Sequence, residues 1–290
     1  MSAMTLEEAQ ELLGGRDLIA IGARADDERR RRHGARTTFV RVLEVHVDAI
    51  PEALPLAAEP GEIRVIGRPQ SADAAVTAVR RVLSLGNRMP VTAFSLADLA
   101  EVAGSARALP AMLRLLCDAG LQSLAELPID RFPDPVAAVA AAHAAGLRVP
   151  RVTVQGTPTE APGTPVDLVE RARQLQAAVG GIRAFAPLPR TWSVAHPSTG
   201  YDDVKTIAAA RLLADSIDSI QVDWALYGPK LAQVALTMGA DDVDAVSALP
   251  GDLGRRRSPI EEIRRNIAAA GLEPIERDGY YRVLERQTGS

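Results

Sequence analysis

The chain has 290 residues, of which 47% are apolar and 24% are charged, a composition typical of a globular protein with a substantial core. Its net charge of −4 offers no electrostatic attraction to nucleic acid or to an anionic membrane, so we expect neither as a partner. Apolar runs stay below the roughly 20 residues that span a bilayer, and the acidic amino terminus lacks the basic region of a signal peptide. One cysteine excludes an intramolecular disulfide, so we expect a cytoplasmic protein.

Two helices are predicted in the first 35 residues. Residues 5–13 form a short amphipathic helix, in which Thr5 and Glu8 have the spacing of a capping box. Residues 17–34 form a second, highly charged helix.

A regular alternation of strands and helices then begins. Strand patterns occur at residues 37–47, 62–66, 90–94, 123–127, 151–154, 182–187, 219–222 and 242–247. Helical periodicity occurs at residues 72–85, 96–119, 133–145, 166–179, 201–214, 230–238 and 259–270. Short strands that are apolar on both faces and alternate with helices predict an α/β fold, a parallel (β/α)8 TIM-type barrel over residues 36–272. A doubly wound open sheet is the alternative, but no Gly-x-Gly-x-x-Gly follows any strand.

Two segments depart from this rhythm. Residues 48–61 contain Pro51, Pro55 and Pro60, which leave little room for a helix, so the first crossover is shortened. Residues 273–290 form a small carboxyl-terminal extension, with a hairpin predicted over 274–284 that turns at Asp278-Gly279. Without a linker or a low-complexity stretch, residues 1–290 are predicted to form a single domain, with residues 1–35 as its amino-terminal helical segment.

Several ordered motifs point to a family. The motifs are GYDDVKTIAAAR at 200–211, QVDWALYGPKLAQ at 221–233, MGADDVD at 238–244, RSPIEEIR at 257–264 and GLEPIERD at 271–278. Together they resemble the radical SAM enzymes of the futalosine route to menaquinone, aminofutalosine synthase and dehypoxanthine futalosine cyclase, whose close relatives are the deazaflavin-cofactor synthases. RRRRHG at 29–34 and AFAPLP at 184–189 extend the resemblance over most of the chain. It implies a radical-SAM-like barrel associated with menaquinone biosynthesis.

The chain departs from that family where the family holds its cofactors. The family's Cys-x-x-x-Cys-x-x-Cys loop after the first strand binds an iron–sulfur cluster through thiolates, but residues 48–61 contain no cysteine and the single Cys117 lies in a predicted helix. The family's Gly-Gly pair, which lets backbone approach S-adenosylmethionine, is Gly67-Arg68 here, so we expect the arginine to intrude on that space. Its acidic pair beyond the eighth strand is replaced by residues 246–250. We therefore expect a degenerate member with no cofactor: it lacks the iron–sulfur cluster, and S-adenosylmethionine binding is doubtful.

Ligands in this fold bind at the carboxyl ends of the strands, where the sequence places many polar side chains. His46, Glu126 and Asp223 are the candidate acid–base residues, with a hydrogen-bonded structural role as the alternative for His46. The candidate ligand-binding residues are Asp48, Arg68, Gln70, Gln155, Arg190, Trp192, Trp224, Lys230 and Asp244. No metal site is predicted, because the four histidines are scattered and Asp242 and Asp244 fit a strand end better than a cation site.

Three functions are compatible with these residues. The favoured one is a barrel without a cluster that binds a small polar or aromatic ligand, or an enzyme partner of the menaquinone pathway, without radical chemistry. The alternative is a non-radical enzyme, such as a lyase or hydrolase, in which His46 works with Asp223 or Glu126. A radical enzyme with its cluster held elsewhere requires ligands from other chains or other residue types, and is the least favoured.

Overall fold

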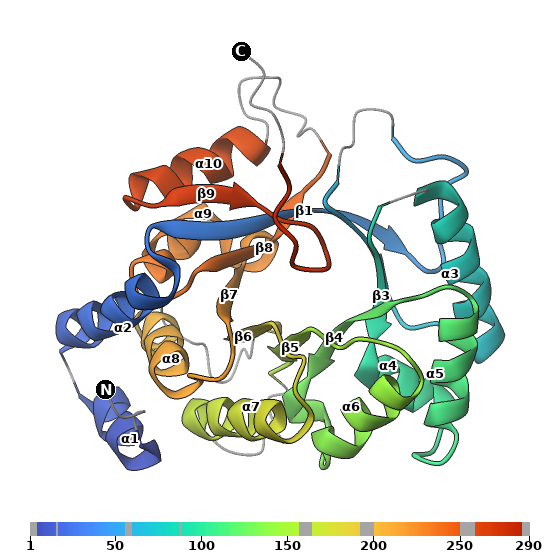
Figure 1. The fold of residues 1–290 in the computed structure, drawn as a ribbon, viewed down its shortest axis with the longest axis horizontal. Coiled ribbons are helices and arrows are strands. Elements are labelled where there is room, and N and C mark those ends of the chain that lie inside the picture. The colour runs from blue at the N-terminus through green and yellow to red at the C-terminus, as the bar shows by residue number, and fades with distance from the viewer. Residues whose placement is uncertain are drawn as a thin grey trace.

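The computed structural model describes residues 5–15, 17–55, 60–86, 89–156, 164–191, 200–249 and 259–285. Eight parallel strands stand in a closed ring (Figure 1). They are β1 (Arg36–His46), β2 (Glu62–Ile66), β3 (Val91–Ser95), β4 (Ser123–Pro128), β5 (Arg151–Val154), β6 (Ala184–Pro189), β7 (Ser219–Asp223) and β8 (Asp242–Ser247). The strands pair in chain order, and β1 closes the ring by pairing with both β2 and β8. The predicted (β/α)8 barrel is confirmed.

Helices surround this ring (Figure 1). They are α3 (Ala72–Gly86), α4 (Leu96–Ala103), α5 (Leu109–Asp118), α6 (Pro135–Ala144), α7 (Pro165–Val179), α8 (Gly200–Leu213), α9 (Trp224–Leu236) and α10 (Pro259–Ala269), with a 3₁₀ turn η1 (Ile129–Arg131) before α6. The two amino-terminal helices, α1 (Leu6–Gly14) and α2 (Leu18–His33), pack on α8. No helix in the described ranges is long and apolar enough to cross a membrane.

The predicted helix over residues 96–119 is wrong, because the chain breaks it into α4 and α5. Gly104 ends α4 in a left-handed conformation with φ +71°, and its N–H donates to the carbonyls of Ala100 and Glu101. Such a φ suits glycine, and Pro110 at the start of α5 has no N–H to continue a helix. Helix α9 also begins earlier than predicted, although Gly228 interrupts it with non-helical torsion angles.

The carboxyl-terminal hairpin is only partly as predicted. Its first arm is a ninth strand, β9 (Glu273–Glu276), which joins the barrel sheet in parallel with the start of β1. Only the following turn is hairpin-like, with an antiparallel bridge between Arg277 and Val283. The physical reason lies in the length of β1. This strand has eleven residues and begins at Arg36, but its pairing with β2 starts only at Val42. The first half of β1 therefore has an unpaired edge on that side, and β9 covers it.

The expectation of strands apolar on both faces holds only for the outer face. Ile63 and Val65 of β2 join the hydrophobic core between strands and helices, while Glu62 and Arg64 alternate with them and are also buried. Arg151 of β5 forms an ion pair with Asp244 of β8, two strands that are not neighbours in the ring, so their contact crosses the barrel lumen. The inner face of this barrel is therefore charged.

We call this charged interior the lumen network and define it as Glu62, Arg64, Glu126, Arg151, Arg190, Asp223, Asp242, Asp244 and Arg277. Its shortest contacts include Arg277 Nη2 to Asp242 Oδ2 at 2.6 Å and Arg64 Nε to Glu62 Oε1 at 2.8 Å. Although burial raises the pKa of Asp242, the guanidinium of Arg277 lowers it below its usual value. Asp242 is thus held as a buried carboxylate by its partner.

We predict that R277M strongly destabilises the fold, by about 3–5 kcal/mol at pH 7, because it leaves a buried carboxylate unpaired. The side chains of Arg277 and Asp242 are 3% and 0% exposed. The measurement is urea denaturation, with R282M as a control at an exposed arginine of the same turn. The double variant R277M/D242N is expected to recover part of the loss, since the unpaired charge is gone. A loss in R277M no larger than that in R282M would contradict the prediction.

Candidate functional site

A small cavity lies at the carboxyl ends of the strands, where barrel enzymes bind their ligands. Its volume is about 70 Å³, well below the roughly 300–1,000 Å³ typical of whole-ligand pockets. The cavity is lined by polar side chains from strands β1 to β5, from the residue that follows β6 and from the start of α4. They are Glu44, Arg64, Ser95, Asp98, Glu126, Arg151 and Arg190. A cavity of this size accommodates one polar group of a ligand.

Three guanidiniums of the lumen network reach this cavity. Arg151 bonds Glu126 at 3.1 Å, Nη2 to Oε2, and Arg190 bonds Asp223 at 3.1 Å, Nη1 to Oδ2. Burial, and after it the charge of the neighbouring Arg64, lower the pKa of Arg151 to about 10. The site therefore gathers three guanidiniums beside three carboxylates, those of Glu44, Asp98 and Glu126. A buried guanidinium gains from any ligand oxygen that it can bond.

Glu126 and Asp223, two of the predicted acid–base residues, are brought together by one arginine. Arg190 lies 3.1 Å from Asp223 and 3.6 Å, Nε to Oε2, from Glu126. Although burial raises the pKa of Glu126, Arg190 and Arg151 lower it below its ordinary value of 4.5. Asp223 also caps α9, since its Oδ1 accepts from the N–H of Leu226. Both carboxylates are thus ion-paired.

The third candidate, His46, lies apart from this pair. Its Nδ1 accepts from the N–H of Asp48 at 3.3 Å, and the Asp48 carboxylate is 3.7 Å away. Its ring packs on Gly67, whose φ of +87° favours glycine and where a Cβ would lie 2.7 Å from His46 Nε2. Half of the imidazole remains exposed. His46 therefore occupies the space beside the glycine that corresponds to the family's Gly-Gly pair.

The expectation that Arg68 intrudes there is wrong. Its guanidinium instead bonds Glu101 on α4 at 2.6 Å, and Arg131 bonds the same carboxylate. With its side chain 60% exposed, Arg68 lies outside the set of residues that line the cavity. His46 fills the space beside Gly67, and the Arg68 side chain lies at the surface in its ion pair with Glu101.

The other predicted ligand residues have varied surroundings. Asp244 is 1% exposed and forms ion pairs with Arg64 and Arg151 in the lumen, below the cavity. Gln155 is half-buried, and Trp224 packs against the hydrophobic core. Gln70 and Lys230 are exposed, and neither lines the cavity. Trp192 lies outside the described residues.

Asp98 was missed by the sequence analysis. It lies in the first turn of α4, which Ser95 caps, and it is half-buried at the wall of the cavity. Burial and the charges of Glu101 and Glu126 raise its pKa, against the usual effect of a helix amino terminus, which stabilises a carboxylate. Its side chain makes no hydrogen bond or ion pair with another described residue. A sequence search for acidic residues in the first turn after each strand would have found it.

Glu44, Arg64 and Arg151, which lie in β1, β2 and β5, were also missed. The signal was present in the alternation of Glu62-Ile-Arg64 and Asp242-Val-Asp244, where charged residues occupy every second position. Backbone strain marks the same end of the barrel, since Phe94 (φ +60°) and Ala245 (φ +56°) are non-glycine residues at positive φ near the ends of β3 and β8. Such strain is often concentrated at functional sites.

These residues do not fit an iron–sulfur cluster held by three thiolates. Cys117, the one cysteine of the chain, is half-buried on α5, where its Sγ would lie 3.0 Å from a Cβ at Gly146 in the turn before β5. That turn is at the amino-terminal end of the strands, opposite the cavity. Among the residues that the structure describes, no three His, Cys, Asp or Glu side chains are grouped as metal ligands.

The comparisons with known proteins confirm the resemblance seen in the motifs. The chain is 32% identical to aminodeoxyfutalosine synthase of Streptomyces coelicolor over an alignment of 170 residues. This alignment covers 51% of this chain and 44% of that protein. The chain is also 32% identical over 172 residues to 5-amino-6-(D-ribitylamino)uracil–L-tyrosine 4-hydroxyphenyl transferase 1 of Methanosarcina barkeri, covering 52% and 45%. The chain thus spans about half the length of the curated relatives it matches. No family model matches the chain.

Solved structures confirm the fold. Methylornithine synthase superposes with a TM-score of 0.63 at 15% identity, over 94% of each chain. The hydrogenase maturase HydG from Carboxydothermus hydrogenoformans gives 0.66 at 13% identity, over 97% of this chain and 78% of the other. The chain has the barrel fold of these structures, and over about half of its length it is similar in sequence to the aminodeoxyfutalosine synthases.

We predict that R190Q raises the pKa of Glu126, because a guanidinium that holds it low is removed. Since the folded pKa of Glu126 lies below its ordinary value of 4.5, the glutamate stabilises the fold above pH 4.5 and loses this contribution as the pH falls. The stability difference between wild type and R190Q should therefore be largest at neutral pH and shrink in acid. Urea denaturation at several pH values measures it. An exposed-site control, R80Q, should show no such trend, and a difference that grows in acid would refute the assignment.

Proposed function

We propose that this protein binds a small polar or aromatic ligand at the carboxyl end of its barrel, in metabolism related to the futalosine route, without a thiolate-held cluster. The single observation that carries the proposal is the set of guanidiniums from Arg64, Arg151 and Arg190 that line one cavity at the position where this fold binds ligands. The homology to aminodeoxyfutalosine synthases supports the metabolic setting.

The volume and the lining of the cavity determine which functional group such a ligand must have. Its volume of about 70 Å³ has room for one functional group, and that group should accept hydrogen bonds from guanidiniums, as a carboxylate or carbonyl does. Arg190, with its side chain 22% exposed, is the member of the lumen network best placed to meet a ligand that enters from solvent. The remainder of the ligand lies above the strand ends.

The absence of radical chemistry is part of the proposal and rests on donor chemistry. A cluster needs thiolates at the barrel mouth, and the one thiol of this chain lies on α5. S-adenosylmethionine is also not proposed as a ligand, since His46 lies against Gly67, where the family's glycines admit that cofactor. In the other form of this proposal, the protein binds an enzyme of the menaquinone pathway instead of a small ligand.

We predict that aminodeoxyfutalosine or L-tyrosine, both named by the relatives of this chain, binds the protein and raises its melting temperature. R190Q should weaken that binding about tenfold or more, because it removes a charge-assisted hydrogen bond. R80Q, at an exposed arginine of α3, is the matched control and should bind like wild type. Calorimetric titration measures both variants. Equal affinity in R190Q and wild type would rule out the barrel mouth as the site.

A second candidate function is supported by Asp98 and Glu126. Their pKa values are displaced in opposite directions, upward for Asp98 and downward for Glu126, within one cavity. Two carboxyl groups whose pKa values are displaced in opposite directions can serve as the acid and the base in a lyase or hydrolase reaction. In this form the alternative uses Asp98 with Glu126, while His46 lies beside Gly67.

We predict that D98N is more stable than wild type at pH 7. Because burial raises the pKa of Asp98 in the fold, its ionisation destabilises the folded state as the pH rises above its ordinary value of 3.8. The advantage of D98N should therefore be present at neutral pH and vanish below pH 3.8. Thermal denaturation measures it, with D73N, at an exposed position in the first turn of α3, as the control. If D98N is less stable than wild type at pH 7, Asp98 is a structural capping residue.

A further inference from the structure

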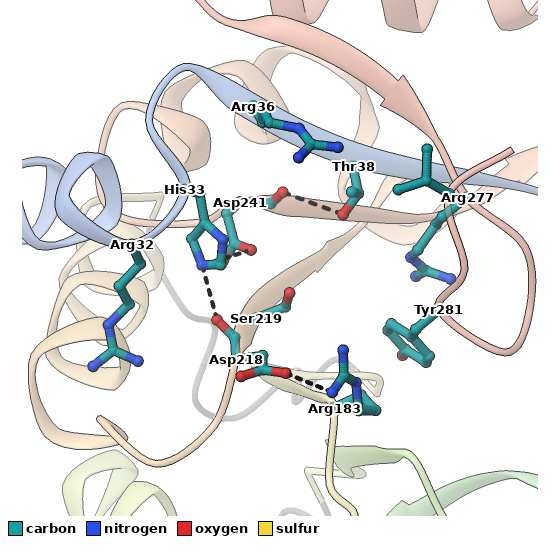
Figure 2. Close-up of a pocket in the computed structure, with 11 residues that line it drawn as sticks. Arg32, His33, Arg36, Thr38, Arg183, Asp218, Ser219, Asp241, Arg277 and Tyr281 are labelled. Atoms are coloured by element: carbon teal, nitrogen blue, oxygen red, sulfur yellow. Dashed lines mark hydrogen bonds and ion pairs between the residues drawn. The ribbon is translucent and has the colours of Figure 1, made fainter. Parts of the chain in front are cut away.

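A second and larger cavity lies at the opposite end of the barrel, among the starts of the strands. Its volume is about 330 Å³, within the range of roughly 300–1,000 Å³ found for ligand pockets. It is enclosed by the end of α2, the starts of β1, β6, β7 and β8, and the carboxyl-terminal turn (Figure 2). It is separate from the cavity of the proposed function, and the two share no lining residue.

Most charges around this cavity are already paired. Asp241 accepts from Arg211 and from the N–H of Ile220, and lies 3.4 Å, Oδ2 to Nε2, from His33. The guanidinium of Arg277 is held by both oxygens of Asp242. These groups form fixed walls of the cavity.

The wall also holds two exposed arginines, of which one is in a surface ion pair, and one hydroxyl. Arg36, the first residue of β1, is exposed and makes no hydrogen bond or ion pair with another described residue. Arg183, before β6, meets only Asp218 at 2.9 Å, Nη1 to Oδ2, and their side chains are 53% and 55% exposed. Figure 2 shows Arg36 and Arg183 on opposite sides of the cavity, with Ser219 between them.

A rigid aromatic residue completes this wall. Tyr281 has a positive φ of +63°, an uncommon conformation for a residue with a side chain. Its ring stacks on the guanidinium of Arg277, which lies 4.0 Å from the ring centroid. A strained backbone held by an ion-paired arginine gives the cavity a preformed surface.

From this arrangement we infer that the cavity at the amino-terminal end of the barrel binds a small oxyanion, bonded by Arg36 and Arg183 with the hydroxyl of Ser219. The formal balance supports an anion: Arg32 is paired with Glu28, and after this pair and those above are counted, the guanidinium of Arg36 is the uncompensated charge. Asp218 competes for Arg183, and a surface pair of this kind is weak, so a ligand carboxylate or phosphate can displace it. Carboxylate and phosphate oxygens share the geometry that a guanidinium recognises.

The test uses succinate and inorganic phosphate as probes in calorimetric titrations of the full chain, with sodium chloride holding ionic strength constant. At least one probe should bind, and its identity distinguishes a carboxylate from a phosphate ligand. R36Q should weaken that binding about tenfold. D218N should strengthen it several-fold, because it frees Arg183 and removes a repelling charge. R80Q should leave it unchanged.

Several results would overturn the inference. They are the absence of binding by either probe at millimolar concentration, equal affinity in R36Q and wild type, or weaker binding in D218N. The last outcome would show that Asp218 supports the cavity rather than competing with its ligand. Circular dichroism spectra of each variant confirm that the fold is intact, as expected for substitutions at exposed side chains.

Discussion

The pairing of buried guanidiniums with buried carboxylates across the barrel lumen is the constraint on which this structure depends. Glu62, Asp242 and Asp244 are each at most 3% exposed, and an isolated buried carboxylate would cost several kcal/mol. Glu62 is compensated by Arg64 of its own strand, and Asp242 and Asp244 are compensated by arginines from other strands or from the carboxyl-terminal turn. Closure of the ring is what brings these partners together, so the fold and its charged interior require one another.

The outer architecture was predictable from sequence because it depends on local patterns. The bounds of β2, β5 and β8 agree residue for residue with the predicted strands, since β-branched runs between turn signals are local features. The break at Gly104 was missed because apolar periodicity continues on both sides of it. The parallel pairing of β9 with β1 could not be predicted, because it depends on an edge that exists only once the ring has closed.

The candidate site was predictable only in part, for a similar reason. Residues near the carboxyl ends of the strands were found because they end or follow apolar runs, and Glu126, Asp223 and Arg190 do lie together. Their grouping around a single guanidinium is a contact between β4, β7 and the end of β6, which no spacing along the chain encodes. Asp98 and Arg151 were missed because their significance lies in burial: half-burial raises the pKa of one, and full burial lowers that of the other.

Stability alone does not account for so many arginines in the interior. Replacing buried ion pairs with apolar residues of similar volume is often neutral or stabilising, so a barrel of this size could be filled more simply. The lumen network extends from Arg277, at the wall of the amino-terminal cavity, to Arg190, at the carboxyl-terminal one. Because its arginines reach cavities at both ends while its carboxylates hold them from within, the arrangement is better suited to fixing guanidinium donors at the cavity walls than to filling space. Recognition of ligand oxygens is the role that this geometry serves.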